Sequence, residues 1–215
     1  MPRPEKQLQL IAGIGLRAHK GGAVVVGVAV TGGVPRVVVS TVLETSAEGD
    51  RLSFEPYRIA AETARGPQGK ATAEAAAVVA EGRKRQEQLA TSGLQGMVRQ
   101  MQAAGCKPVV VALLVNRAGW ITDVLEYSLA WPEHVPVAEA LAVRDALRFA
   151  SGQCGLAVAE LDEKSLVDIA TTTLGLSSTE IAATLKMLGA PRGKPWRKEQ
   201  KLACLSAWIA VSNQH

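Results

Sequence analysis

Residues 107–115 (KPVVVALLV) form a continuous apolar run that follows a long segment rich in helix-forming residues. A run of this kind is typical of a strand that is buried on both faces of a parallel sheet. Parallel strands must be joined by a crossover, which is usually a helix. The succession of a long helical segment and a buried strand therefore predicts an α/β fold.

Strand patterns dominate the first third of the chain. Residues 23–30 (AVVVGVAV) are rich in β-branched side chains and lie between two Gly-Gly pairs, and residues 35–45 follow after a short turn. These two segments are predicted to pair as an antiparallel hairpin. Residues 51–62 are interpreted as a third strand, which Pro56 would confine to an edge or a bulge. Residues 8–16 (LQLIAGIGL) fit either an additional strand or a short helix.

Helical and strand patterns alternate in the rest of the chain. Residues 71–105 predict one or two helices, with breaks at Gly82 and at residues 91–93. Ser177 or Ser178 ahead of Glu180 is typical of a capped helix start. The further predicted elements are a helix at 137–152, a strand at 154–161, and helices at 177–189 and 196–212.

This order predicts a single domain over residues 1–215, built as a mixed five-stranded sheet flanked by helices. Residues 1–22 are assigned to an N-terminal extension or an extra strand, and residues 63–75 to a mobile loop. Residues 23–30 are predicted to lie centrally, antiparallel to residues 35–45 and parallel to residues 108–115.

Composition limits the classes of protein. Hydrophobic residues make up 47% of the chain and aromatic residues only 4%, so an aliphatic core is expected. The net charge of +4 favours anionic partners without requiring one. The three cysteines lie far apart and fit neither a disulfide framework nor a zinc motif. No segment has the pattern of a signal peptide or a membrane span, so we expect a soluble, cytoplasmic protein.

A cluster of cations near the C-terminus is the strongest candidate binding site. Its predicted nucleic-acid-binding residues are Arg192, Lys194, Trp196, Arg197, Lys198 and Lys201. Trp196 would offer a stacking surface, and the cations would contact phosphates. The alternative is a solvated first helical turn with Trp196 as a packing anchor. Cations at a helix N-terminus oppose the helix dipole, which favours a compensating anion.

Two other groups of residues invite a functional interpretation. The first is a group of aromatic residues within one stretch of twelve, Trp120, Tyr127 and Trp131, in a chain poor in aromatics. It predicts a surface that binds a protein partner or a second copy of the chain. The alternative is a loop folded over the core. The carboxylates between residues 160 and 168 fit a metal or acid/base site, but also a strand exit and helix start.

The order of elements resembles that of the ribonuclease H-like superfamily, and in detail that of the Holliday-junction resolvases of the RuvC type. Residues 24–33 (VVVGVAVTGG) resemble the first strand of that family. Residues 159–189 resemble the segment after its fifth strand, with Lys164 near a basic position, and residues 193–211 (GKPWRKEQKLACLSAWIAV) resemble its last helix. The resemblance implies a ribonuclease H-like domain that interacts with DNA or RNA.

The resemblance also implies two divalent cations, held by carboxylates on the first strand, the fourth strand and the last helix. The first-strand carboxylate would fall at Ala29, or at Gly15 if residues 10–16 form the first strand. The fourth strand has no carboxylate, and the last-helix positions fall near Lys198 and Lys201. An ammonium group cannot bind a metal. The resemblance therefore implies a pseudo-nuclease with no catalytic residues, metal or cofactor.

Three functions are compatible with the sequence. The first is a catalytically inactive pseudo-resolvase that binds nucleic acid or acts as a scaffold. The second is a divalent-metal nuclease with relocated carboxylates, such as Glu44, Glu55, Glu160 or Asp162. The third is an oligomerising structural protein. The first two differ in whether any three carboxylates converge at the end of the central strand.

Overall fold

The computed structural model describes residues 10–63, 70–116, 120–192 and 196–214. Their centre is a five-stranded sheet with the strand order β3-β2-β1-β4-β5. The strands are β1 (Leu10–His19), β2 (Gly22–Thr31), β3 (Val34–Glu44), β4 (Cys106–Val115) and β5 (Ala157–Asp162). The mixed α/β architecture predicted from the sequence is confirmed.

The N-terminal segment supplies the central strand. β1 pairs antiparallel with β2 and parallel with β4, while β4 pairs parallel with β5. The predicted antiparallel pairing of residues 23–30 with β3 is confirmed. Their predicted parallel pairing with β4 is wrong, because β1 lies between β2 and β4. Residues 10–16 are therefore the first strand, and not part of an extension.

The predicted third strand at residues 51–62 is wrong, since this segment forms helices α1 (Arg51–Phe54) and α2 (Pro56–Thr63). The Asp50 carboxylate accepts hydrogen bonds from the backbone N–H groups of Leu52 and Ser53, which caps α1. Pro56 is the first residue of α2, where the absence of an N–H group has no cost. Both are helix-start signals that outweigh the strand-like alternation.

Of the one or two helices predicted for residues 71–105, the single helix is confirmed as α3 (Ala73–Ala103), and the breaks predicted at Gly82 and at residues 91–93 are wrong. Gly82 does not interrupt the helix. Because it has no side chain, the segment of α1 and α2 packs closely against α3 at this position. A β-carbon at position 82 would lie 2.6 Å from the carbonyl oxygen of Leu52 and even closer to Pro56. Of the predicted 63–75 loop, residue 63 ends α2 and residues 73–75 begin α3, residues 70–72 lie outside both helices, and residues 64–69 lie outside the described residues.

The C-terminal half contains the remaining helices. They are α4 (Val124–Ala130), α5 (Val135–Gln153), α6 (Leu166–Leu174), α7 (Ser178–Gly189) and α8 (Lys198–Ser212). Short 3-10 turns precede α5 (η2, Pro132–His134), precede α6 (η3, Glu163–Ser165) and follow α7 (η4, Ala190–Arg192). The predicted cap of α7 is confirmed, because Ser177 and Glu180 form a reciprocal capping box.

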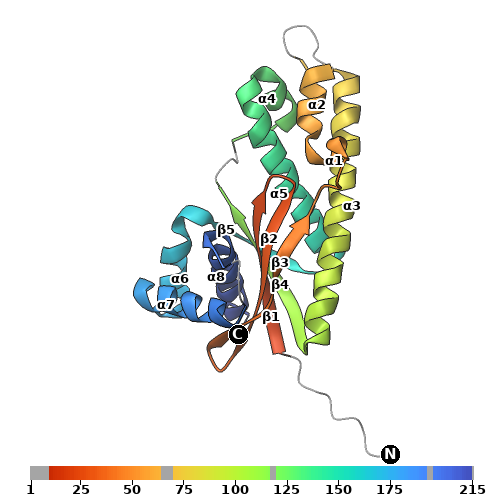
Figure 1. Ribbon diagram of the computed structural model, residues 1–215. Coiled ribbons are helices and arrows are strands. Elements are labelled where there is room, and N and C mark those ends of the chain that lie inside the picture. Colours follow the sequence, from red (N-terminus) through yellow and green to blue (C-terminus); the bar gives the residue numbers. More distant parts are fainter. Residues whose placement is uncertain (1–9, 64–69, 117–119, 193–195, 215) are drawn as a thin grey trace, which may run out of the picture.

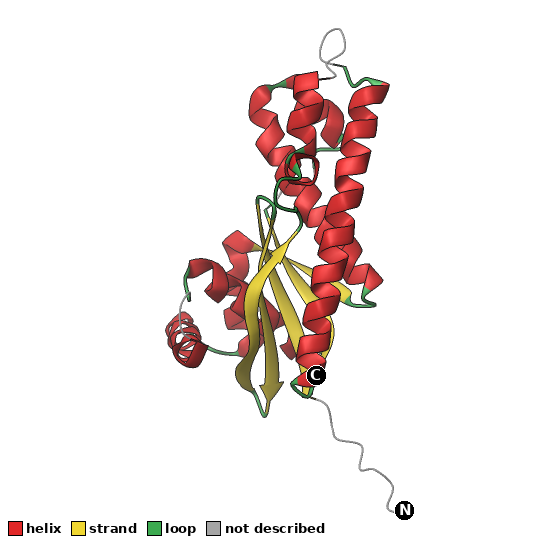
Figure 2. Cartoon of the chain, turned by 45° about the vertical axis from the view of Figure 1, so that its right-hand side comes forward, coloured by secondary structure: helices red, strands yellow, loops and turns green. Residues whose placement is uncertain are grey.

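Helices cover both faces of the sheet (Figures 1 and 2). Helices α3 and α5 pack on one face against side chains such as Ile14, Leu16 and Leu113. Helices α6, α7 and α8 pack on the other face against Val26, Val28 and their neighbours. Helices α2 and α4, with the first turns of α3 and α5, extend beyond the sheet around a small separate core.

Three expectations about the chain as a whole can be compared with the described residues. No helix among them is both long enough and apolar enough to span a membrane. The three cysteines are free thiols, with Cys106 and Cys204 buried and Cys154 half-buried. The aliphatic core expected from the composition is present on both faces of the sheet.

Candidate nucleic-acid interface

Gly15 occupies the first-strand position at which the resemblance would put a carboxylate, and α8 lies directly on it. Successive residues of a strand face opposite sides, so Gly13 and Gly15 both face α8. A β-carbon at Gly13 would lie 2.6 Å from the carbonyl oxygen of Ala207. A β-carbon at Gly15 would clash with the carbonyl of Ala203 and lie 2.6 Å from the Ser206 hydroxyl oxygen. The backbone packing leaves no room for a side chain at position 15.

The fourth strand presents only apolar side chains to the same helix. Val110, Ala112 and Leu114 point toward the α8 side of the sheet, where Leu114 joins the core around α8 and the other two contact Ala210. No carboxylate of β4 is available there, as the sequence predicted. This face of the sheet is filled with hydrocarbon and backbone.

The last-helix positions differ from the sequence-based assignment. Ala203 and Ser206 lie opposite Gly15, whereas Lys198 and Lys201 lie further toward the N-terminus of α8. Both lysines line a groove of about 320 Å³ between α6, α7 and α8, which has an apolar floor and no other charged residue in its lining. The lysines therefore lie beside this groove and not at the first-strand position.

An ion pair that the sequence analysis did not predict lies near the carboxyl end of β1. Arg17 lies two residues beyond Gly15 and so on the same face of the strand. Its guanidinium donates two hydrogen bonds, of 3.0 and 3.1 Å, to the Glu163 carboxylate that follows β5. Two residues 146 positions apart give no local sequence signal, so only the sheet order shows that they meet.

The cation cluster at the start of α8 is only partly described. Lys194 lies outside the described residues, as does the Arg192 side chain, although its backbone ends η4. Trp196 is half-buried: its ring packs on Gly189, and its indole N–H donates a 2.8 Å hydrogen bond to the carbonyl oxygen of Leu185. This is the anchoring contact of the alternative interpretation. The stacking role stays a prediction.

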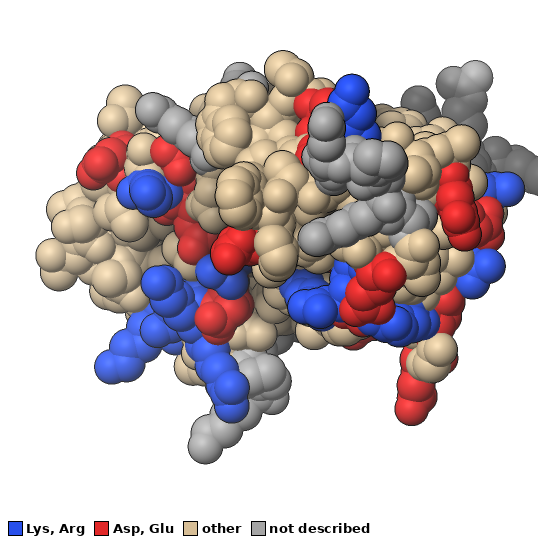
Figure 3. Space-filling view, turned by 90° about the horizontal axis from the view of Figure 1, so that it is seen from above, with Lys and Arg blue, Asp and Glu red and all other residues tan. Residues whose placement is uncertain are grey.

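The cations at the start of α8 share their turn with one acidic residue, Glu199. Among the described residues, Arg197, Lys198 and Lys201 form no ion pair, whereas most exposed arginines of α1–α3 do. Seen from above (Figure 3), Lys and Arg side chains project as a group on the α6–α8 side and alternate with acidic ones on the α3 side. Unpaired ammonium groups beside a positive helix end favour anion binding.

The carboxylates considered as relocated metal ligands are dispersed. Glu160 pairs with Arg148. Asp162, two residues further on, accepts the backbone N–H of Lys164 and the Ser165 hydroxyl. Glu55 pairs with Lys20, Arg51 and Arg58. Within the described ranges, no three His, Cys, Asp or Glu side chains are arranged to hold a metal.

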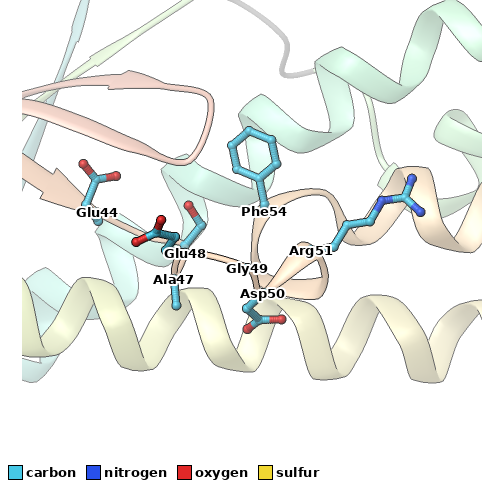
Figure 4. Close-up of a pocket in the computed structure, with 8 residues that line it drawn as sticks. Glu44, Ala47, Glu48, Gly49, Asp50, Arg51 and Phe54 are labelled. Atoms are coloured by element: carbon cyan, nitrogen blue, oxygen red, sulfur yellow. The ribbon is translucent and has the colours of Figure 1, made fainter.

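Glu44 lines a separate pocket of about 530 Å³ at the end of β3, shown in Figure 4. Its lining residues are Glu44, Ser46, Ala47, Glu48, Gly49, Asp50, Arg51 and Phe54. Asp50 is directed toward α3, where it pairs with Arg85, and Arg51 is directed away from the pocket. The acidic groups thus point in different directions.

Two of the three predicted aromatic residues are brought together at α4. Trp120 contacts Tyr127 edge to face, at 5.4 Å between ring centroids. Trp120 and Trp131 are 70% and 63% exposed. The alternative prediction, a loop folded over the core, is therefore wrong for both tryptophans. Whether they bind a partner stays a prediction.

Comparison with known proteins supports the fold. RuvC from Thermus thermophilus has a TM-score of 0.53 and 13% identity, over 94% of this chain and 95% of that chain. T. thermophilus RuvC in complex with a Holliday junction substrate has the same score and identity, over 95% and 94%. No protein-family model matches the sequence, and no curated protein does.

The strand order and the similar solved structures together define the fold class of this chain. The chain is a single α/β domain of ribonuclease H-like architecture, with a mixed five-stranded sheet flanked by helices. Within that class, the solved structures to which it is similar are those of RuvC.

Proposed function

We propose that this protein is a RuvC-like pseudo-nuclease that binds nucleic acid without cleaving it. The packing of α8 on Gly15 is the observation that carries the proposal. Two-metal cleavage requires carboxylates that fix both cations beside the scissile phosphate. Here the backbone of α8 fills the first-strand position, and β4 adds only apolar side chains. The residues present do not fit a metal pair.

The binding half of the proposal rests on charge. Arg197, Lys198 and Lys201 lie unpaired, among the described residues, at the N-terminus of α8, and Arg192 and Lys194 are close in sequence. Cations in such a cluster neutralise phosphates and release counterions. The T. thermophilus RuvC neighbour bound to a Holliday junction has the same fold. We propose DNA or RNA as the ligand and the cytoplasm as the place of action.

A nuclease with relocated carboxylates is the less favoured alternative. Its candidate ligands Glu44, Glu55 and Glu160 lie on β3, between α1 and α2, and on the edge strand β5. Two of the three are already paired with arginines. In the described part of the chain, no observation favours this alternative.

Salt dependence of binding tests the proposal. Anisotropy of a labelled four-way junction, a duplex and a single strand would be measured at several salt concentrations. If Lys198 and Lys201 contact phosphates, Lys198→Ala and Lys201→Ala should each reduce the log-log salt slope by about one. Lys84→Ala, which removes one exposed cation from α3, should leave the slope unchanged. An equal loss from Lys84→Ala, or no binding at low salt, would reject this site.

A further inference from the structure

Helix α4 is flanked by the two most exposed aromatic side chains in the described part of the chain. Trp120 precedes it and is 70% exposed, and Trp131 follows it and is 63% exposed. The sequence contains only four Trp, two Tyr and two Phe. Leaving two large apolar rings in water is unfavourable, and exposed apolar side chains that lie together commonly mark an interaction surface.

Trp120 is ordered by contact with a second aromatic ring. Its ring lies edge to face against Tyr127, with planes 82° apart. Tyr127 is stacked on His134 at 3.9 Å with planes 4° apart, and the His134 Nδ1 lies 2.7 Å from the Tyr127 carbonyl oxygen. A ring that is already ordered loses little conformational entropy when a ligand binds.

The charged residues of the segment that carries these rings are all acidic. Residues 120–134 contain Asp123, Glu126 and Glu133 but no Lys or Arg. Asp123 caps α4 through the Glu126 N–H, and Glu126 accepts the Ala71 N–H. Neither these two carboxylates nor Glu133 forms an ion pair with any described residue. No ion pair with a described residue therefore neutralises their charges.

The exposed aromatic rings and the acidic side chains together indicate which chemical groups a partner would present. Carboxylates repel phosphate, so a nucleic-acid strand is disfavoured here even though bases stack on tryptophan. A guanidinium group is attracted both by carboxylates and by the face of an indole ring. We propose that the surface formed by Trp120, Asp123, Glu126, Tyr127, Trp131 and Glu133, called the α4 surface below, docks an arginine-containing segment of a partner protein.

The α4 surface is separate from the proposed nucleic-acid interface. Helix α4 lies at the end of the molecule beyond the sheet (Figure 1), and the groove with Lys198 and Lys201 is lined by residues of α6, α7 and α8. Failure of one proposal therefore leaves the other testable.

Synthetic peptides test the docking proposal. The full-length protein would be titrated with acetyl-GRGRGRGRGR-amide and with the same peptide carrying citrulline, the uncharged isostere of arginine, and binding would be followed by calorimetry. The arginine peptide should bind at least tenfold more tightly than the citrulline peptide. The double variant Trp120→Ala/Trp131→Ala should bind at least tenfold more weakly, with an unchanged melting temperature because both rings are exposed.

Matched variants separate charge from fold. Asp123→Asn, Glu126→Gln and Glu133→Gln keep the side-chain acceptors that cap α4 and receive the Ala71 N–H, and together they should weaken peptide binding about tenfold. Phe149→Ala, which removes a 44% exposed ring on α5, should have no effect. Equal affinity for both peptides would overturn the proposal. So would a self-association or a single-stranded DNA affinity that the double tryptophan variant abolishes.

Discussion

Glu139 on α5 is a buried carboxylate whose surroundings favour its protonated form. The side chain is 5% exposed, one oxygen accepts the backbone N–H of Arg58 at 2.9 Å, and the other is buried without a hydrogen-bond partner. Burial raises the pKa of Glu139 to about 7, against the opposing backbone hydrogen bonds from α2, and the nearby Glu55 adds to the increase. Lys20 acts in the opposite direction.

The pKa of Glu139 makes stability depend on pH. The ordinary pKa of 4.5 applies to the unfolded chain, so between about 4.5 and about 7 the folded protein binds more protons. The contribution of this group to stability is therefore fully present below the lower value and is lost as pH rises to the higher one.

Glu139→Gln removes that titration while keeping an oxygen for the Arg58 N–H. Between pH 5 and pH 8, the fall in unfolding free energy should be smaller in the variant by about 2 kcal/mol, since one pKa unit corresponds to roughly 1.4 kcal/mol. Urea denaturation of both proteins at several pH values measures the difference. Parallel pH profiles would show that Glu139 is ionised in the folded protein.

At the scale of elements, the contact of α8 with β1 is the feature on which the proposed function rests. The sequence left residues 8–16 ambiguous because Gly13 and Gly15 interrupt the β-branched pattern. Those glycines are needed because the α8 backbone approaches them closely. A requirement of this kind becomes visible only when the partner helix is known. Gly82 was predicted to break a helix, but its lack of a side chain allows Pro56 to pack closely against α3. That contact, too, is visible only when the partner segment is known.

Gly15→Ala tests this contact directly. The added methyl group would meet the carbonyl oxygen of Ala203, so the variant should lose about 3 kcal/mol of unfolding free energy or more. Gly152→Ala is the control, because a β-carbon there meets no atom within 4 Å and alanine favours a helix by up to about 1 kcal/mol. If chemical denaturation showed equal stability for Gly15→Ala and the unmodified protein, α8 would be able to move away and the position would be open.

At the scale of the whole molecule, the sequence predicted the fold class from patterns that need no tertiary information. The apolar run at residues 107–115 predicted β4, and glycine stops and Ser177 predicted the ends of helices. Features that depend on distant contacts were missed. The pairing of Arg17 with Glu163, the burial of Glu139 and the central place of β1 all arise from segments far apart in the chain.

The candidate site was predicted in outline only. The shortage of carboxylates on the first and fourth strands was visible in the sequence, and the structure adds that α8 fills the space at Gly15. The basic residues of α8 were also visible, but their place beside a groove between α6 and α7, away from Gly15, was not. Side-chain direction along a helix decides which residues face a strand, and a single sequence does not fix that register.

A cleavage assay tests the central claim most directly. The purified protein would be incubated with a labelled four-way junction, a duplex and a single strand, each with magnesium or manganese, and the products separated by size. Because the position of Gly15 has no room for a carboxylate and β4 offers none, we predict intact substrates under all these conditions. Robust metal-dependent cleavage that Glu44→Gln, Glu160→Gln or Asp162→Asn abolishes would contradict the pseudo-nuclease account.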